Sequence, residues 1–115
     1  IAWDLIELAD KPLTIIYDNA RNVADNLIAE DGSLAIRITN EKFSHELCKR
    51  FRKPLVSTSA NISGQPAPQS FDEISDEIKQ GVDYIVKYRQ NELEAHKASS
   101  IIKLGAQGQI EIIRE

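Results

Sequence analysis

Residues 12–38, PLTIIYDNARNVADNLIAEDGSLAIRI, contain the alternation of short patterns that decides the fold. The run at 12–17 is short and rich in β-branched residues, which predicts a buried strand. The following segment predicts a helix that is capped by Asn19 and ends at Gly32. SLAIRI at 33–38 predicts a second strand. A strand, a helix and a strand in this order indicate an α/β fold.

The patterns on both sides of this stretch continue the alternation. The segment SFDEISDEIKQG predicts a helix that begins with a capping box, Ser70 to Glu73, and ends at Gly81. The last two strands form a predicted hairpin, in which Gly105 or Gly108 takes positive φ. We expect an α/β fold with a twisted mixed sheet, helices packed on it and an antiparallel edge. The remaining predicted elements are helices at 2–10, 40–51 and 70–81, and strands at 54–58, 82–88, 99–104 and 109–114.

Composition restricts the class of protein. The chain has 115 residues, 42% of them hydrophobic and 28% charged, which suits one domain with a real core. No apolar run is long enough for a bilayer span, and the start has no signal-peptide pattern. The formal net charge of −4 gives no global basic field, and the single cysteine allows no internal disulfide. We therefore expect a cytoplasmic protein. Because the chain lacks methionine and opens in helical periodicity, we also expect one domain, 1–115, truncated at its N-terminus.

The segment PLVSTSANISG, residues 54–64, is the first candidate for a binding site. In open α/β sheets, ligands bind beyond the carboxyl ends of strands, and these hydroxyl and amide groups follow a predicted strand. Ser57 and Ser59 would share one face of that strand, and Thr58 would point to the other. Such groups suit a phosphate or a carboxylate. A plain polar loop is the alternative, and composition alone favours it.

Two other segments repeat this theme. Ser33 and Arg37 fall on one face of the strand at 33–38. An arginine there either clamps an anion or is solvated on an edge strand. The hydroxyls of Ser99 and Ser100 stand at the start of another strand. The basic run CKRFRK at 48–53 could touch a nucleic-acid backbone, although a solvated helix end is the stronger interpretation. No nucleophile–His–acid pattern, zinc spacing or phosphate-loop motif occurs.

These motifs resemble one known family. KPLVSTSANISGQPAP, residues 53–68, closely resembles the signature of the YrdC-like family, the threonylcarbamoyl-adenylate synthases. The segments SLAIRI, KPLTIIY, KASSIIKL and IEIIRE are similar to other strands of that family, in the right order. Family members also carry an N-terminal Pro-Thr-Asp-Thr-x-Tyr-Gly strand–loop and a basic Lys-x-Arg segment, which this chain lacks. Three positions depart from the family pattern: Lys11, Thr39 and Ser100 replace glycine, proline and threonine.

The resemblance implies a function and a set of site residues. It implies that L-threonine, bicarbonate and ATP form threonylcarbamoyl-adenylate and pyrophosphate, and that tRNA-modification partners transfer the product to a tRNA adenosine. Mg²⁺ would accompany ATP, and no side chain would act as a nucleophile. This chain alone is expected to be inactive. By motif position, threonine would be bound by Arg37, Ser57 and Ser99. ATP would be bound by Ser33, Ser59, Asn61 and Arg114, with Thr14 and Thr58 as reserves.

Two alternatives stay open at this point. The first is a module that binds double-stranded RNA or tRNA, because the family fold has a concave basic surface; the acidic composition speaks against it. The second is the YrdC-like domain of a carbamoyl-transfer maturation protein. A flanking zinc-finger or acylphosphatase segment would distinguish that much larger chain.

Overall fold

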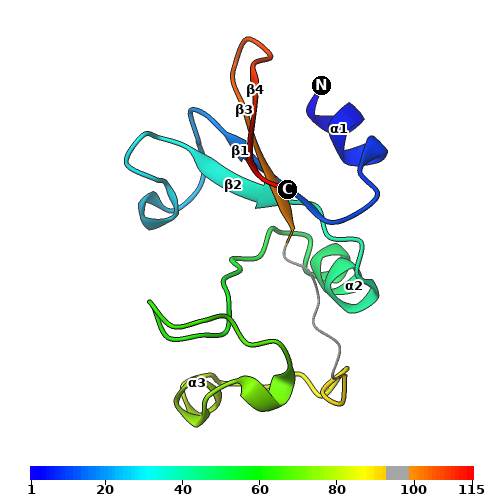
Figure 1. The fold of residues 1–115 in the computed structure, drawn as a ribbon, viewed down its shortest axis with the longest axis vertical. Helices are drawn as coiled ribbons and strands as arrows, with labels where there is room; N and C mark the ends of the chain where they lie inside the picture. Colours follow the sequence, from blue (N-terminus) through cyan, green and yellow to red (C-terminus); the bar gives the residue numbers. More distant parts are fainter. Residues whose placement is uncertain (93–98) are drawn as a thin grey trace. The chain divides into compact units, whose positions relative to one another are not determined.

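The computed structural model describes residues 1–92 and 99–115, which belong to two compact units (Figure 1). The first comprises Ile1–Lys53 and Ala98–Glu115 and is called the sheet unit below. The second, Pro54–Lys97, is called the loop unit. Each unit is described by itself.

The sheet unit is built on a four-stranded mixed sheet (Figure 1). Its strands are β1 (Leu13–Tyr17), β2 (Leu34–Arg37), β3 (Ser100–Leu104) and β4 (Ile110–Arg114), in the order β2-β1-β3-β4. The central pair, β1 and β3, is parallel, and both edge strands are antiparallel to their neighbours. The expected α/β class with a mixed sheet and an antiparallel edge is confirmed.

The register of the strands separates an apolar face from a polar one. Ile15 pairs with Ile36 on one side and with Ile102 on the other, and paired residues share a face of the sheet. Ile15 is 1% exposed and is the only fully buried large side chain among the described residues. On the opposite face, Thr14 pairs with Arg37 and with Ile101. The sequence alternation therefore places the hydroxyl and the guanidinium away from the core.

A β-bulge in the last hairpin sets the direction of Arg114. Ile101 pairs with Arg114, whereas Ile102 pairs with Ile112, so Ile113 is an extra residue in β4. The bulge brings Arg114 to the face of Ile101 and Thr14. The hairpin itself confirms the sequence prediction, and Gly108 takes the positive φ of 85° at its turn.

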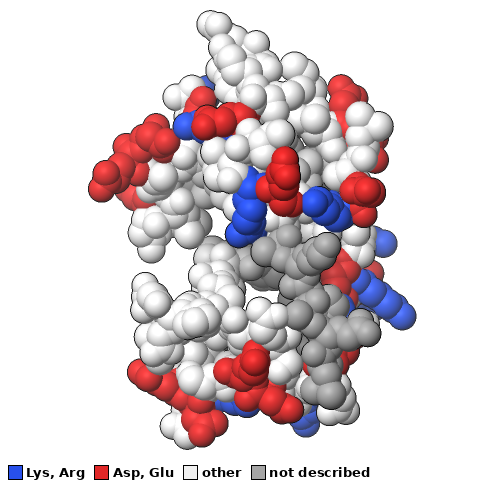
Figure 2. Space-filling model, in the orientation of Figure 1, with Lys and Arg blue, Asp and Glu red and all other residues white. Residues whose placement is uncertain are grey.

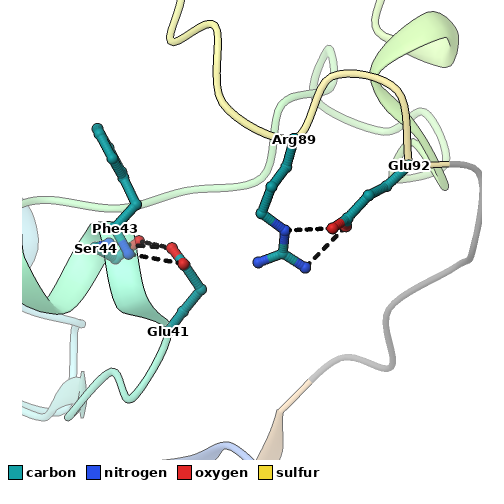
Figure 3. Close-up of polar contacts among 5 residues, drawn as sticks. All are labelled: Glu41, Phe43, Ser44, Arg89 and Glu92. Atoms are coloured by element: carbon teal, nitrogen blue, oxygen red, sulfur yellow. Dashed lines mark hydrogen bonds and ion pairs between the residues drawn. The ribbon is translucent and has the colours of Figure 1, made fainter.

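Two helices of the sheet unit also agree with the sequence patterns. Helix α1 spans Ala2–Leu8 and helix α2 spans Lys42–Phe51. Glu41 caps α2, because its carboxylate accepts hydrogen bonds from the Phe43 N–H (2.8 Å) and the Ser44 N–H (3.0 Å), as Figure 3 shows. Neither these helices nor any other helix of the described residues has the length and apolar character of a membrane span.

The helix expected between Asn19 and Gly32 is wrong. Only a short 3₁₀ turn, η1 (Asp25–Leu27), forms there. Asn19 and Asn22 have φ values of 56° and 59°, in the left-handed region where no α-helix continues. Asparagine tolerates this region, so the residue that suggested a helix cap instead starts an irregular loop.

The loop unit contains none of its expected strands. Residues 54–58 and 82–88 are irregular, and no strand of the described residues pairs with them. Their apolar side chains are exposed, including Val56 at 74% and Tyr84 at 73%. β-propensity reflects packing on a half-buried pleated surface, and these segments have none to pack on among the described residues.

The predicted capping box is also wrong. A 3₁₀ turn, η2 (Phe71–Glu73), precedes the short helix α3 (Asp76–Gln80). The Ser70 side chain makes no capping hydrogen bond, and Ser75 Oγ accepts instead from the Ile78 N–H at 3.4 Å. The Glu73 carboxylate accepts from the Gln69 N–H rather than closing the box on Ser70. The end of the helix at Gly81 is confirmed.

Candidate functional site

A polar cluster lies at the end of the sheet where β1 and β3 begin. Thr14 Oγ1 and Ser99 Oγ are 2.7 Å apart in a half-buried hydrogen bond. Thr14 pairs with Arg37 of β2 across the antiparallel ladder. A hydroxyl of β1 therefore lies between two residues that the sequence assigns to threonine binding.

Arg114 completes this cluster through the backbone of Ser99. Its Nε and Nη2 donate to the Ser99 carbonyl oxygen at 2.9 and 2.7 Å. Lys11 Nζ and Ser100 Oγ each donate to the Glu115 carbonyl oxygen at 2.8 Å. The ends of three strands are thus tied together by side chains, and the Arg114 guanidinium uses two of its N–H groups internally.

Arg37 is the second arginine of this cluster. It lies at the end of edge strand β2 and is exposed. Within residues 1–92 and 99–115, no hydrogen bond or ion pair engages its guanidinium. The sequence offers two interpretations of Arg37, an arginine that clamps an anion and a solvated arginine on an edge strand, and the structure has the second arrangement. Because the guanidinium is exposed, its N–H donors are also available to a carboxylate.

Ser33 lies at the opposite end of β2, in an acidic environment. It is 6% exposed, and its Oγ donates to Asp31 Oδ1 at 2.6 Å. The Ser33 hydroxyl and N–H hold the pKa of Asp31 below its usual value, with a smaller contribution from Lys103. Lys103 Nζ lies 3.4 Å from Asp31 and 3.9 Å from Asp18. Ser33 and Arg37 are four positions apart along the strand, about 13 Å.

An open pocket of about 250 Å³ adjoins this acidic end of the sheet. Its lining holds two carboxylates and one lysine, so its formal charge is negative. No three histidine, cysteine, aspartate or glutamate side chains gather to hold a metal ion in the part of the chain that the structure describes. The pocket is lined by Asp18, Lys103, Gly105, Gln109, Ile110 and Glu111.

The Ser-Ala-Asn-Ile-Ser-Gly segment of the loop unit is held by local hydrogen bonds. Asn61 Nδ2 donates to the carbonyls of Ile62 and Gln65 at 3.1 and 3.0 Å. Gly64 takes a φ of 86°, and the Gln65 N–H closes the turn on the Ile62 carbonyl at 2.9 Å. The Asn61 Oδ1 atom is buried and has no hydrogen-bond partner among the described residues. The hydroxyl-bearing residues before it, Ser57, Thr58 and Ser59, are exposed.

The predicted site residues therefore fall into three places. Arg37, Ser99 and Arg114 gather at one end of the sheet, and Ser33 lies at the other end. Ser57, Ser59 and Asn61 belong to the loop unit, and their roles stay predictions. Thr14 was only a reserve in the sequence analysis, because the strand register that places it between Arg37 and Ser99 has no sequence signal.

Two side chains of the basic run at the end of α2 contact neighbouring side chains. Arg50 Nε pairs with Glu46 at 3.0 Å, which lowers the pKa of that glutamate, and Lys53 Nζ lies 5.8 Å from the Phe51 ring centroid. Figure 2 shows acidic and basic side chains scattered among uncharged ones on the face it draws. These contacts match a solvated helix end.

A family model described as telomere recombination, which covers the Sua5, YciO and YrdC proteins, matches residues 1–115. The chain belongs to this family. No solved structure matches it.

Similar curated members of this family share one name, threonylcarbamoyl-AMP synthase. The protein of Pseudoalteromonas translucida is 34% identical over 72% of this chain and 44% of its own length. That of Serratia proteamaculans is 38% identical over 58% of this chain and 35% of its own length. That of Sodalis glossinidius is 35% identical over 77% of this chain and 48% of its own length. The chain thus spans between about a third and a half of these relatives.

Proposed function

We propose that the protein carrying this sequence is a threonylcarbamoyl-AMP synthase, which converts L-threonine, bicarbonate and ATP into threonylcarbamoyl-AMP and pyrophosphate. Two independent observations support this proposal. Relatives with that name match more than half of the chain. In addition, the sheet unit presents a solvent-open arginine beside a pair of hydrogen-bonded hydroxyls, and this single observation gives the proposal its physical basis.

The proposed reaction needs positioned substrates rather than a covalent intermediate with the protein. The threonine amine and bicarbonate give a carbamate with loss of water. A carbamate oxygen then attacks the α-phosphorus of ATP, and pyrophosphate leaves. Rate enhancement in such a step comes from orientation and from charge stabilisation, which agrees with a site of hydroxyl, amide and guanidinium groups.

Each predicted site residue receives a role in this proposal. Arg37 holds the threonine carboxylate by a bidentate pair, and Ser99 adds a hydroxyl beside it. Ser57 would contribute to the same amino acid. The residues assigned to the nucleotide are Ser33, Ser59, Asn61 and Arg114.

Mg²⁺ enters this scheme as part of the substrate, bound to the phosphates of ATP. It needs no cage of protein carboxylates, because Mg²⁺ in such sites is held mainly by phosphates and water. The product would pass to partner proteins that modify a tRNA adenosine in the cytoplasm.

The test measures pyrophosphate release by the natural protein that carries this sequence, at its full length. The assay contains MgATP, bicarbonate and labelled L-threonine, and chromatography detects the labelled adenylate. We expect pyrophosphate release that requires both L-threonine and bicarbonate. Omitting each in turn, and replacing L-threonine by D-threonine, provides the controls. Absence of threonine-dependent pyrophosphate and of labelled adenylate would refute the proposed function.

A further inference from the structure

We propose that Thr14 is a positioning residue that orients the hydroxyl of Ser99 toward the bound amino-acid substrate. This inference rests on the proposed function and deepens it. It assigns a defined role to Thr14 of β1, which the sequence analysis names only as a reserve.

The geometry leaves the Ser99 hydroxyl with one side-chain partner among the described residues. Thr14 Oγ1 lies 2.7 Å from Ser99 Oγ, the ordinary distance for a bond between two hydroxyls. The two residues are separated by 85 positions in the chain, so the contact depends on the parallel pairing of β1 with β3. In that pairing Thr14 faces Ile101, two residues beyond Ser99 on the same face of the sheet.

The backbone around Ser99 is already fixed by other groups. Arg114 donates two hydrogen bonds to the Ser99 carbonyl oxygen, at 2.9 and 2.7 Å. The Ser100 N–H donates to the Pro12 carbonyl at 2.9 Å. The freedom that remains is rotation of the Ser99 side chain and of its O–H. The bond to Thr14 acts on this rotation, because a hydroxyl that accepts one hydrogen bond directs its own proton elsewhere.

The charge of the cluster decides the direction of the hydroxyl chain when substrate is bound. A threonine carboxylate held by Arg37 would lie over the face of the sheet that Arg37, Thr14 and Ser99 share, since Thr14 and Arg37 face each other across the ladder. Protons of a hydroxyl chain point toward such an anion, and each bond strengthens the next. Thr14 then donates to Ser99, and Ser99 donates to the carboxylate. Thr14 touches no reacting atom in this arrangement.

Kinetics of the full-length protein test this role with two substitutions at one position. Thr14→Val keeps the shape of the side chain and removes the hydroxyl, whereas Thr14→Ser keeps the hydroxyl. We expect Thr14→Val to raise the KM for L-threonine roughly 3- to 10-fold, the effect of losing one hydrogen bond in a network, with the KM for ATP unchanged. Thr14→Ser should restore most of the affinity. Thr39→Val is the matched control in the same unit, because the one hydrogen bond of its hydroxyl to the described residues is accepted from the Glu41 N–H at 3.3 Å, beside α2.

A double-mutant cycle with Ser99→Ala separates orientation from simple stability. If Thr14 acts through Ser99, Thr14→Val adds no further rise in KM to the Ser99→Ala protein, and thermal unfolding confirms that each variant is folded. A wild-type protein without threonine-dependent turnover refutes the proposed function and this role together. An active wild type with unchanged KM in Thr14→Val, or with additive effects in the double mutant, overturns the role of Thr14 alone.

Discussion

The two units hold their polar groups in different ways. In the sheet unit, hydrogen bonds join residues far apart in sequence: Thr14 and Ser99 are 85 positions apart, and Lys11 and Glu115 are 104 apart. In the loop unit, the bonds around Asn61 span one and four positions. The sheet unit therefore orients its polar groups through tertiary structure, whereas the loop unit orients its polar groups through turn geometry. A substitution in the sheet unit should therefore affect residues far away in sequence, whereas a substitution in the loop unit should affect its sequence neighbours.

The largest effect is expected from Arg37, an exposed cation of the sheet unit. Arg37→Ala removes the bidentate donor of the proposed carboxylate site, so we expect L-threonine binding to weaken roughly 10- to 100-fold, the range for charged hydrogen bonds. The fold should stay intact because Arg37 is exposed and ends an edge strand. Calorimetric titration of the full-length protein with L-threonine measures the change.

Arg21→Ala is the matched control for charge. Arg21 is exposed in the same unit, in the loop between β1 and β2. Its loss should leave threonine affinity unchanged. Equal weakening by both substitutions would assign the effect to general electrostatics, and unchanged binding by Arg37→Ala would remove that residue from the site.

A pair of glycine substitutions compares the two units directly. Gly32 in the sheet unit and Gly64 in the loop unit have φ values of 83° and 86°, and a Cβ on either would meet no atom within 4 Å. An alanine at either position is therefore strained only by its backbone, at about 1–2 kcal/mol. Hydrogen exchange measured by NMR should detect each cost in its own unit.

Gly64→Ala should speed exchange of the Gln65 amide, which closes the turn on Ile62. The same variant should leave the amides of β1 and β3 protected as before. Gly32→Ala should speed exchange of the Ala20 amide, whose N–H donates to the Gly32 carbonyl at 3.0 Å. Faster amide exchange throughout both units in either variant would show that the two units open together, and would contradict the expectation that each substitution acts within its own unit.

The same contrast explains which features the sequence could predict. The sheet strands were predicted correctly because short runs of β-branched residues, such as the one around Ile15, indicate a buried strand, and the sheet buries that residue. The helix after Asn19 and the strands at 54–58 and 82–88 were wrong because their apolar residues have helical or strand periodicity without a buried surface to meet. Ser57, Ser59 and Asn61 came from a local motif, which needs no tertiary knowledge. Thr14 needed the register between β1, β2 and β3, which no local pattern records.

A smaller effect tests how helix α3 begins. Ser75→Ala removes the hydroxyl that accepts the Ile78 N–H, and we expect it to destabilise the helix by about 0.5–1 kcal/mol. Ser70→Ala is the matched control, since the Ser70 side chain makes no capping bond. Amide exchange within Asp76–Gln80 measures both. A larger effect at Ser70 than at Ser75 would reinstate the capping box that the sequence suggested.

The smallest expected effect compares a short-range and a long-range bond to one carboxylate. Asp31 accepts from Ser33, two positions away, and from Lys103, 72 positions away. The Ser33 hydroxyl is the main reason that the pKa of Asp31 lies below 3.8. Ser33→Ala should therefore raise the pKa of Asp31 more than Lys103→Gln does, as measured by NMR titration of the carboxyl carbon.

The sign of the linked stability follows from this direction. A carboxyl whose pKa is lower in the folded state stabilises the fold above its unfolded pKa, and that contribution is lost as the pH falls through the folded pKa. For Asp31 the loss is confined to pH values below about 3.8, and solvent screening keeps it small because the side chain is 57% exposed. In Ser33→Ala the N–H of residue 33 still donates to Asp31, so the pKa should rise only part of the way. A larger rise in Lys103→Gln would mean that tertiary contacts orient this end of the sheet as well as the end that holds Thr14 and Ser99.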